Sequence, residues 1–335
     1  MSNTESNAAQ EFLARIHHLA QTALERYGLS RETILTAINH SENVTFRVED
    51  PISGSLTILR VHRVGYHSFE GIRSELLWMD ALRREAGVET PEVIPARDGS
   101  LIQILRSSEL RGARHAVMFQ FLPGREPGED DLRASFERLG TVTAKMHLHA
   151  KAWRRPGGFV RQRWDYETML GARPIWGRWQ DGLGVDGARI RILERLSETI
   201  KRRLHAYGTA PERFGLIHAD LRLANLLIED DRTKVIDFDD CGFSWHLYDL
   251  GAALSFIEHR ADVPELVEAW TRGYRKVTTL APEEAREIPT FIMLRRLLLV
   301  AWIGSHSETE LARQQGVSFT EITCHLAEDY LRRLA

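Results

Sequence analysis

The chain has 335 residues, of which 43% are hydrophobic and 27% charged, a balance that allows a large globular core. This length predicts two domains, or two lobes around a cleft. Its 44 Lys and Arg against 47 Asp and Glu give a formal charge of −3, so the charge balance does not favour nucleic acid as a partner.

The first part of the chain predicts a β-rich lobe. Apolar residues recur at helical spacing over residues 12–27, and Gly28 ends that helix. Alternating and apolar runs then predict strands at 44–48, 56–62, about 93, 101–102 and 116–121, with a helix at 72–82. The break Leu122-Pro123-Gly124 sets the boundary, so residues 1–121 are the predicted N-lobe and residues 122–335 the predicted C-lobe.

After this boundary the pattern becomes mainly helical. Helices are predicted near residues 132–150, 190–207, 250–259, 265–278, 289–303 and 319–334. A β-rich lobe joined by a hinge to a helical lobe predicts an α+β fold with a small-molecule site between the lobes.

Sequence features also bear on location. Cys241 and Cys324 are far apart and match neither a metal site nor a disulfide framework. The polar start MSNTESNAAQ does not have the pattern of a signal peptide. The most apolar stretch, residues 297–303, is too short to span a bilayer and indicates a buried helix. We therefore expect a cytoplasmic protein without a membrane partner.

The strongest chemical signal lies in GLIHADLRLANLLI, residues 215–228, followed by VIDFDD, residues 235–240. It places Asp220, Asn225 and Asp237 at the spacing used to transfer the γ-phosphoryl group of ATP. That chemistry needs a carboxylate that orients an attacking hydroxyl and accepts its proton, and hard oxygen ligands that hold Mg²⁺ across the phosphates. Asp220 suits the first role, and Asn225 and Asp237 suit the second.

The same segment predicts a β-hairpin. Residues 226–228 and 234–236 have strand character and are separated by the polar turn at 229–232. Asn225 then lies at the entry of the hairpin and Asp237 at its exit, where antiparallel neighbours are about 5 Å apart. The alternative is that these are ordinary loop residues, since Asp and Asn are common in turns.

With these residues assembled, the chain resembles the aminoglycoside phosphotransferase and homoserine kinase type II family, which includes bacterial stress-response Ser/Thr kinases. The resemblance covers about residues 38–303 and is most specific over 217–250. It implies a two-lobed protein-kinase-like fold, ATP and Mg²⁺ as cofactors, Asp220 as catalytic base, and Asn225 and Asp237 as metal ligands. His218 and Asp249 match residues that support the catalytic loop.

The resemblance also implies a nucleotide site in the N-lobe. The linker whose backbone hydrogen-bonds the adenine is matched by Met118, Phe119, Gln120 and Phe121. Arg60 stands in place of the family's phosphate-anchoring Lys, with Glu75 as its expected partner. Ser41 and Asn43 lie where other kinases have a Gly-rich loop, so phosphate binding relies on backbone N–H groups and small polar side chains. Alternatively, Arg60 is an edge-strand surface residue and Glu75 an exposed helical charge.

Two features concern the acceptor. Asp239 and Asp240 can pair with an ammonium group, which suits an amino alcohol, a hydroxy amino acid or an aminoglycoside; alternatively they are solvated, or one assists Mg²⁺. Residues 151–203 hold thirteen Lys and Arg against six Asp and Glu, and four tryptophans, which suits an acidic or planar acceptor unless the tryptophans pack inward. This acid-poor stretch weakens the case for a polycationic aminoglycoside.

We therefore predict an ATP- and Mg²⁺-dependent phosphotransferase that acts on a hydroxyl of a small metabolite, with homoserine or another amino alcohol favoured. The alternatives are an antibiotic kinase of the aminoglycoside type, a stress-response protein Ser/Thr kinase and a catalytically dead nucleotide-binding regulator. A hydrolase with His218 and Asp220 as metal ligands is disfavoured, because no second histidine has suitable spacing. The expected partner is a small hydroxylated acceptor rather than nucleic acid, and the protein is expected to be a monomer or homodimer.

Overall fold

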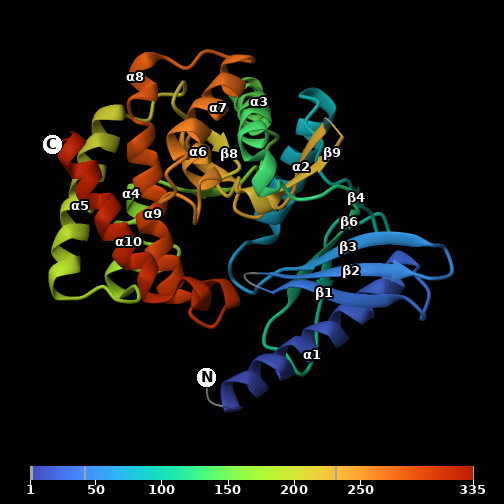
Figure 1. Ribbon diagram of the computed structural model, residues 1–335. Helices are drawn as coiled ribbons and strands as arrows, with labels where there is room; N and C mark the ends of the chain where they lie inside the picture. Colours follow the sequence, from blue (N-terminus) through green and yellow to red (C-terminus); the bar gives the residue numbers. More distant parts are fainter. Residues whose placement is uncertain (1–2, 41–42, 231, 335) are drawn as a thin grey trace. The chain divides into compact units, whose positions relative to one another are not determined.

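The computed structural model describes residues 3–40, 43–230 and 232–334. The chain forms two compact units. The first contains the described residues up to Ala81 together with Thr90–Pro123 and Pro156–Val160, and the second contains the remaining described residues. The chain passes from one to the other between Pro123 and Gly124, inside the break seen in the sequence. Strands dominate the first unit and helices the second (Figure 1), so the fold is α+β, as predicted.

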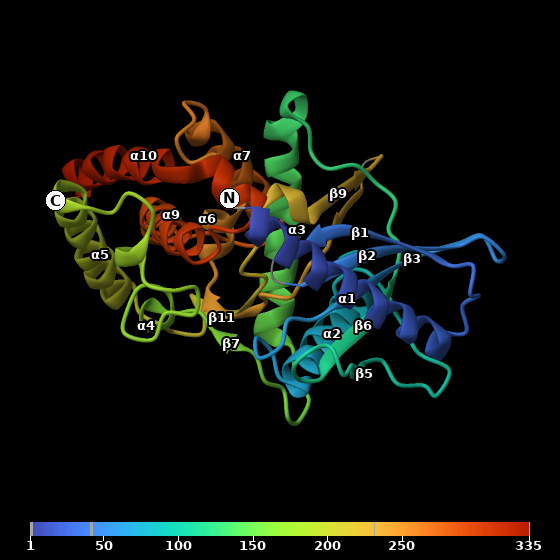
Figure 2. The ribbon, with the colours of Figure 1, turned by 90° about the horizontal axis from the view of Figure 1, so that it is seen from below.

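The first unit is built around an antiparallel sheet. Its strands lie in the order β1 (Ile34–His40), β2 (Val44–Asp50), β3 (Ser55–Val61), β6 (Arg114–Gln120) and β4 (Val93–Ile94), and β5 (Gln103–Leu105) also pairs with β6. The helix α1 (Asn3–Tyr27) packs against the sheet (Figure 2), and α2 (Phe69–Glu85) follows β3.

The core of the first unit lies between α1 and the sheet. Ile16 and Ala20 of α1 and Phe46 and Leu59 of β2 and β3 are all fully buried in it. The edge strand β1 was not predicted from the sequence. Its Ile38 is 55% exposed, so the strand has no clear alternation of buried and exposed apolar residues.

The second unit is mainly helical. Its longer helices are α3 (Leu132–Ala152), α5 (Gly187–Tyr207), α6 (Tyr248–Ala253), α7 (Val263–Arg275), α9 (Ile288–Ser305) and α10 (Glu310–Leu334). The shorter helices are α4 (Tyr166–Met169) and α8 (Pro282–Ala285). One small sheet is the hairpin of β9 (Leu226–Glu229) and β10 (Arg232–Val235), and another joins β7 (Gln162–Arg163), β11 (Gly242–Trp245) and β8 (Phe214–Ile217).

The helix α9 is the most apolar segment of the second unit. Among the described residues, the stretch Pro282–Ser305 is long and apolar enough to cross a bilayer, so the apolar segment is longer than the sequence reading of residues 297–303 suggested. However, 72% of its apolar window is buried inside the structure, as in the core helix of a globular protein. The long apolar run of this segment is explained by its burial among neighbouring helices on all sides.

Candidate active site

The hairpin of β9 and β10 brings Asn225 and Asp237 to one place. Leu226 pairs with Val235 at the open end of the hairpin, and the Ile236 N–H donates to the Asn225 carbonyl at 3.0 Å. Asn225 and Asp237 therefore lie at neighbouring ends of the two strands, in the arrangement expected from the sequence. Asp237 has φ +59°, a left-handed conformation that non-glycine residues rarely adopt.

The predicted catalytic loop, residues 218–225 before the hairpin, is held by Asp249, the second residue of α6. One carboxylate oxygen of Asp249 accepts from the Ala219 N–H at 2.8 Å, and the other from the His218 N–H at 3.3 Å. His147 of α3 reaches the second oxygen through Nε2 at 3.0 Å. Ala219 has φ +67°, so these bonds hold a strained peptide. Burial raises the pKa of Asp249 to about 6, against the opposing effects of His218 and the two N–H groups.

His218 is a buried support for the loop. Its Nε2 lies 3.1 Å from the Ile236 carbonyl and its Nδ1 lies 3.3 Å from the Asp220 N–H. These contacts fit a neutral imidazole that donates from Nε2 and accepts at Nδ1. Both ring nitrogens are thus used by the backbone, which does not suit a metal ligand. In the described part of the chain no group of three His, Cys, Asp or Glu side chains is arranged to hold a metal ion, which argues further against a His-based hydrolase.

The Asp220 side chain is 14% exposed and contacts two arginines. Its Oδ1 accepts from Arg295 Nη2 at 2.5 Å, while Oδ2 lies 3.3 Å from Arg222 Nε. Burial raises the pKa of the Asp220 carboxyl, but the charges of Arg222 and Arg295 outweigh it and hold the pKa below its usual value. Asp220 is therefore ionised at neutral pH, the form that can accept a proton.

Sequence reasoning did not identify either arginine as part of the site. Arg222 lies in the catalytic loop itself, two residues after Asp220. Arg295 lies in the apolar helix α9, 75 residues away in sequence. The available signal was the pair Arg295-Arg296 within an apolar helix, because a buried cation requires a partner.

Asn225 is oriented so that it can bind a cation. Its Nδ2 donates to the Asp220 carbonyl at 2.8 Å and to Asp220 Oδ2 at 3.0 Å. The amide oxygen is then the atom left to meet a metal ion. An amide oxygen and a carboxylate, as Asn225 and Asp237 carry, are the kinds of ligand that Mg²⁺ prefers, since this ion usually takes one or two protein ligands besides water and phosphate. The donor set therefore fits Mg²⁺.

The segment after Asp237 is held by residues of the basic stretch 151–203. Arg161 donates from Nη2 to the Asp239 carbonyl and from Nε to the Cys241 carbonyl, and Trp164 Nε1 donates to the Asp240 carbonyl at 2.8 Å. The Asp239 residue is 5% exposed, whereas Asp240 is half-buried. Asp240 is the more accessible of the two candidate acceptor ligands.

The tryptophans of this stretch mostly pack inward. The buried members, each at most 5% exposed, are Trp164, Trp176 and Trp179. The rings of Trp164 and Trp176 meet edge to face, with centroids 5.2 Å apart. This favours the alternative in which the aromatic residues belong to the core, and it removes most of the support for a planar acceptor.

In the first unit, Arg60 and Glu75 form a buried ion pair. Arg60 Nη2 lies 2.5 Å from Glu75 Oε1, and the two side chains are 7% and 0% exposed. Strand β3, which carries Arg60, lies between β2 and β6 rather than at an edge. The exposed alternatives considered for Arg60 and Glu75 are therefore wrong, although the contact with phosphate stays a prediction.

The other predicted nucleotide residues occupy different settings. Asn43 is buried, and its Oδ1 accepts from the Arg63 N–H at 3.0 Å. Ser41 lies outside the described residues. The segment Met118–Gln120 belongs to β6 and pairs with β3, and the Gln120 N–H donates to the Glu92 carbonyl at 2.8 Å. Phe121 is thus the predicted linker residue that follows the end of the strand.

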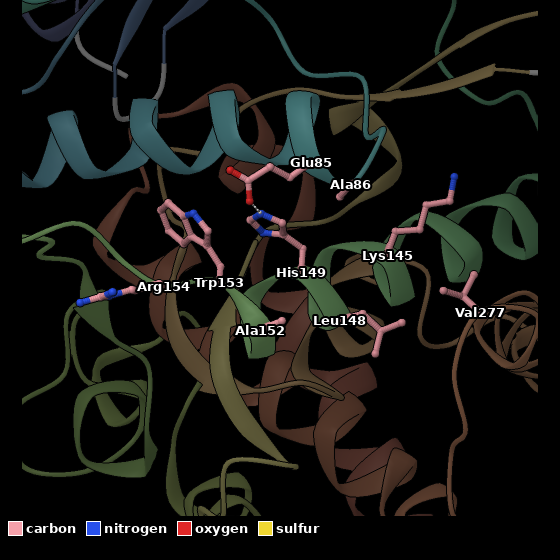
Figure 3. A pocket seen from close by; sticks show the side chains of 9 residues that line it. All are labelled: Glu85, Ala86, Lys145, Leu148, His149, Ala152, Trp153, Arg154 and Val277. Atoms are coloured by element: carbon pink, nitrogen blue, oxygen red, sulfur yellow. Dashed lines mark hydrogen bonds and ion pairs between the residues drawn. The ribbon is translucent and has the colours of Figure 1, made fainter.

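A separate pocket of about 640 Å³ lies in the second unit, along α3 and the end of α2 (Figure 3). Its lining residues are Glu85, Ala86, Lys145, Leu148, His149, Ala152, Trp153, Arg154 and Val277. His149 Nε2 lies 3.1 Å from Glu85 Oε2 across it (Figure 3). None of the predicted catalytic, metal or nucleotide residues lines this pocket, so it is not the site of the chemistry.

Comparisons with known proteins show the family of the chain. Residues 34–288 match the phosphotransferase enzyme family. A solved microcompartment-associated aminopropanol kinase is 43% identical, with a TM-score of 0.87 over 95% of this chain and 99% of that chain. Amicoumacin kinase of Bacillus subtilis (strain 168) is 23% identical over 86% of this chain and 85% of its own length. A solved amicoumacin kinase with AMP-PNP and Ca²⁺ is 21% identical, with a TM-score of 0.76 over 97% and 96% of the two chains. The chain belongs to the phosphotransferase enzyme family and is a phosphotransferase with a hydroxyl group as acceptor, as the sequence predicted.

Proposed function

We propose that this protein transfers the γ-phosphoryl group of ATP, bound with Mg²⁺, to the hydroxyl of a small amino alcohol such as aminopropanol. The observation that carries the proposal is the linked arrangement of an ionised Asp220 with Asn225, which lies beside Asp237 at the open end of the hairpin. The 43% identity with an aminopropanol kinase supports this acceptor class, which also includes the homoserine favoured from the sequence.

In this mechanism Asp220 accepts the proton of the attacking hydroxyl while that oxygen forms its bond to the γ-phosphorus. The bond between the γ-phosphorus and the β–γ bridging oxygen breaks, and ADP leaves. Asn225 and Asp237 would hold the divalent cation through their side-chain oxygens. The bound cation supplies charge neutralisation on the phosphate oxygens. Asp249 and His218 keep the loop in the conformation that presents Asp220, so the protein contributes mainly alignment and electrostatic stabilisation.

For the nucleotide, we propose Arg60 as the phosphate anchor. Glu75 holds the guanidinium of Arg60 in place, as a carboxylate does for the corresponding Lys in kinases. Arg keeps the positive charge and can contact two phosphate oxygens, although it is bulkier than Lys. The Asn43 side chain already accepts a backbone hydrogen bond, so backbone N–H groups near Ser41 and Asn43 are the proposed phosphate contacts. The adenine would be bound by the linker backbone at Phe121.

For the acceptor, we propose that the Asp240 carboxylate pairs with the ammonium group. Asp240 is half-buried next to the metal-binding segment, whereas Asp239 is nearly inaccessible. A partly desolvated ion pair of this kind contributes more than an exposed one. We also propose a cytoplasmic location, since Cys241 and Cys324, the only cysteines of the chain, form no disulfide.

The central test is an ATP-consumption screen over aminopropanol, homoserine, other amino alcohols, aminoglycosides, amicoumacin, nucleosides and unstructured peptides. We expect turnover with an amino alcohol, and a fall in kcat of about 10²–10⁴ for Asp220→Ala, the size of a general-base contribution. Asp181→Ala is the matched control, because that side chain is 69% exposed and far from the loop in sequence. Turnover of Asp220→Ala at the wild-type rate would refute the proposed base.

The acceptor contact is tested separately with Asp240→Asn. We expect KM for aminopropanol to rise roughly 10- to 100-fold, the size of a lost hydrogen bond to a charged group. KM for a propanediol, which lacks the ammonium group, should stay close to its wild-type value. Equal shifts for the two acceptors would contradict recognition of the amine by Asp240.

A further inference from the structure

A buried arginine on α9 contacts the catalytic loop. Arg295 is 2% exposed, and its Nη2 donates to Asp220 Oδ1 at 2.5 Å. The other carboxylate oxygen of Asp220, Oδ2, accepts a hydrogen bond from Asn225 Nδ2 and lies near Arg222. The two oxygens of the carboxylate are therefore held from different directions, and Arg295 holds the one that Asn225 does not.

The guanidinium of Arg295 is itself fixed by several acceptors. Its Nε donates to Ser255 Oγ at 2.9 Å, and its Nη1 donates to Tyr248 Oη at 3.1 Å and to the Ala219 carbonyl at 3.4 Å. Because guanidinium is planar and its donors have a fixed geometry, these bonds define the direction of the Nη2 group. Arg295 thus offers Asp220 a hydrogen bond of set position.

Two aromatic rings lie beside the Arg295 guanidinium. The Arg295 guanidinium lies 5.3 Å from the centre of the Trp176 ring and 5.9 Å from that of Tyr248. Attraction between a cation and an aromatic face offsets part of the cost of burying the charge. An ion pair in such surroundings is screened less by solvent than a surface pair.

The next residue of α9 shows that burial alone does not direct an arginine to the loop. Arg296 is 1% exposed, and its Nη1 lies 2.8 Å from Glu258 Oε2. Its other contacts include Thr323 Oγ1, the Phe319 carbonyl and the Phe319 ring, all of α10. The two consecutive arginines therefore have equal burial and different partners, and Arg295 is the one that reaches the catalytic base.

We propose that Arg295 is a positioning residue, which acts through Asp220 and holds its carboxylate in the orientation that receives the proton of the acceptor hydroxyl. This inference rests on the proposed function, because it assigns the base role to Asp220. Without Arg295 the Asp220 carboxylate can rotate about its last side-chain bond. A smaller fraction of the bound complexes then has the base aligned with the acceptor hydroxyl. The effect falls on kcat, since neither ATP nor the acceptor needs to touch Arg295 for this role.

The test compares Arg295→Met, Arg295→Lys and the control Arg296→Met in the full-length protein. We expect kcat to fall about 100-fold in Arg295→Met, with KM for ATP and for aminopropanol within about threefold of wild type. Arg295→Lys keeps the charge but not the forked geometry of the guanidinium. Its kcat should therefore lie between that of the wild type and that of Arg295→Met. Arg296→Met loses a buried ion pair of similar exposure and should lose thermal stability while keeping kcat per folded molecule.

A double-mutant cycle separates positioning from general destabilisation. In an Asp220→Asn background, Arg295→Met should change the residual kcat by less than about threefold, because its partner is no longer a base. An equal loss in both backgrounds, or a wild-type kcat in Arg295→Met, would overturn the proposal. If Arg295→Met does not fold, Arg295→Lys carries the same cycle. Failure of the proposed function is recognised differently, since the wild-type protein would then not phosphorylate an amino alcohol.

Discussion

The crossing of α3 and α7 connects helix packing to the catalytic loop and can be perturbed by one methyl group. A Cβ atom added at Gly273 would lie 1.8 Å from the Glu137 carbonyl oxygen, and one added at Gly140 would lie 2.0 Å from the Trp270 carbonyl oxygen. The Thr141 hydroxyl donates to the Gly273 carbonyl at 3.2 Å in the same crossing. Glycine is required here because the two backbones approach too closely for a side chain.

The size of the effect of Gly273→Ala follows from this contact. An ordinary carbon–oxygen contact is about 3.3 Å, so the helices would have to separate by roughly 1.5 Å. Overpacking of this kind costs about 1–3 kcal/mol of the free energy of unfolding. Because α3 also carries His147, which donates to Asp249, the shift should reach the catalytic loop and lower kcat as well.

Urea unfolding and kcat of Gly273→Ala, measured beside Gly187→Ala, test this reasoning. Gly187 begins α5, and an added Cβ there meets nothing within 4 Å, so its variant should keep wild-type stability and activity. A Gly273→Ala protein as stable as Gly187→Ala would show that the crossing tolerates separation and that α3 does not constrain the loop.

Two further changes test buried charges. Glu75→Gln leaves the buried Arg60 without its carboxylate partner. We therefore expect the free energy of unfolding, measured by urea titration, to fall by about 3–5 kcal/mol, and ATP to bind more weakly. Unchanged stability would contradict a tight ion pair. His246 is buried with Nδ1 3.0 Å from the Glu212 carbonyl, and burial and the neighbouring His147 hold its pKa well below the usual value. The unfolded chain therefore binds a proton that the folded protein does not, and stability falls as pH decreases through about 6.5, by roughly 2 kcal/mol between pH 7.5 and 5. His246→Asn replaces the Nδ1 donor of the imidazole with the Nδ2 donor of an amide that does not titrate, and it should lose this part of the pH dependence; an unchanged dependence would refute this reasoning.

The parts of the site that the sequence predicted are those set by local geometry. The hairpin follows from two short apolar runs and a polar turn, and its ends necessarily place Asn225 next to the residues before Asp237. The order of the loop and the hairpin along the chain therefore predicted that Asn225 and Asp237 are near neighbours at one end of the hairpin, without knowledge of the rest of the fold. His218, which was matched to a supporting residue of the loop, is buried and contacts the backbone through both ring nitrogens.

The parts that the sequence did not predict depend on contacts between distant segments. The pairs Asp220–Arg295 and His147–Asp249 join residues 75 and 102 positions apart, and no local periodicity encodes them. From the sequence alone, Arg60 and Glu75 could be either a paired site or two surface charges. Their burial in the structure decides for the pair. The edge strand β1 was missed because only one of its four apolar residues, Leu35, is buried, so the strand has no regular pattern of buried positions.

The two arginines of α9 explain how a nearly uniform apolar helix can have one defined orientation. A helix that is apolar on every side can rotate about its axis with little change in buried area, so hydrophobic burial alone does not fix its rotation. Arg295 and Arg296 remove this freedom, because each loses a large amount of hydration on burial and regains it only beside Asp220 or Glu258. Rotation of the helix would separate both pairs at once. Of these two contacts, the one made by Arg295 also holds Asp220 against the core, so the proposed catalytic base is held by the interior of the protein as well as by its own loop.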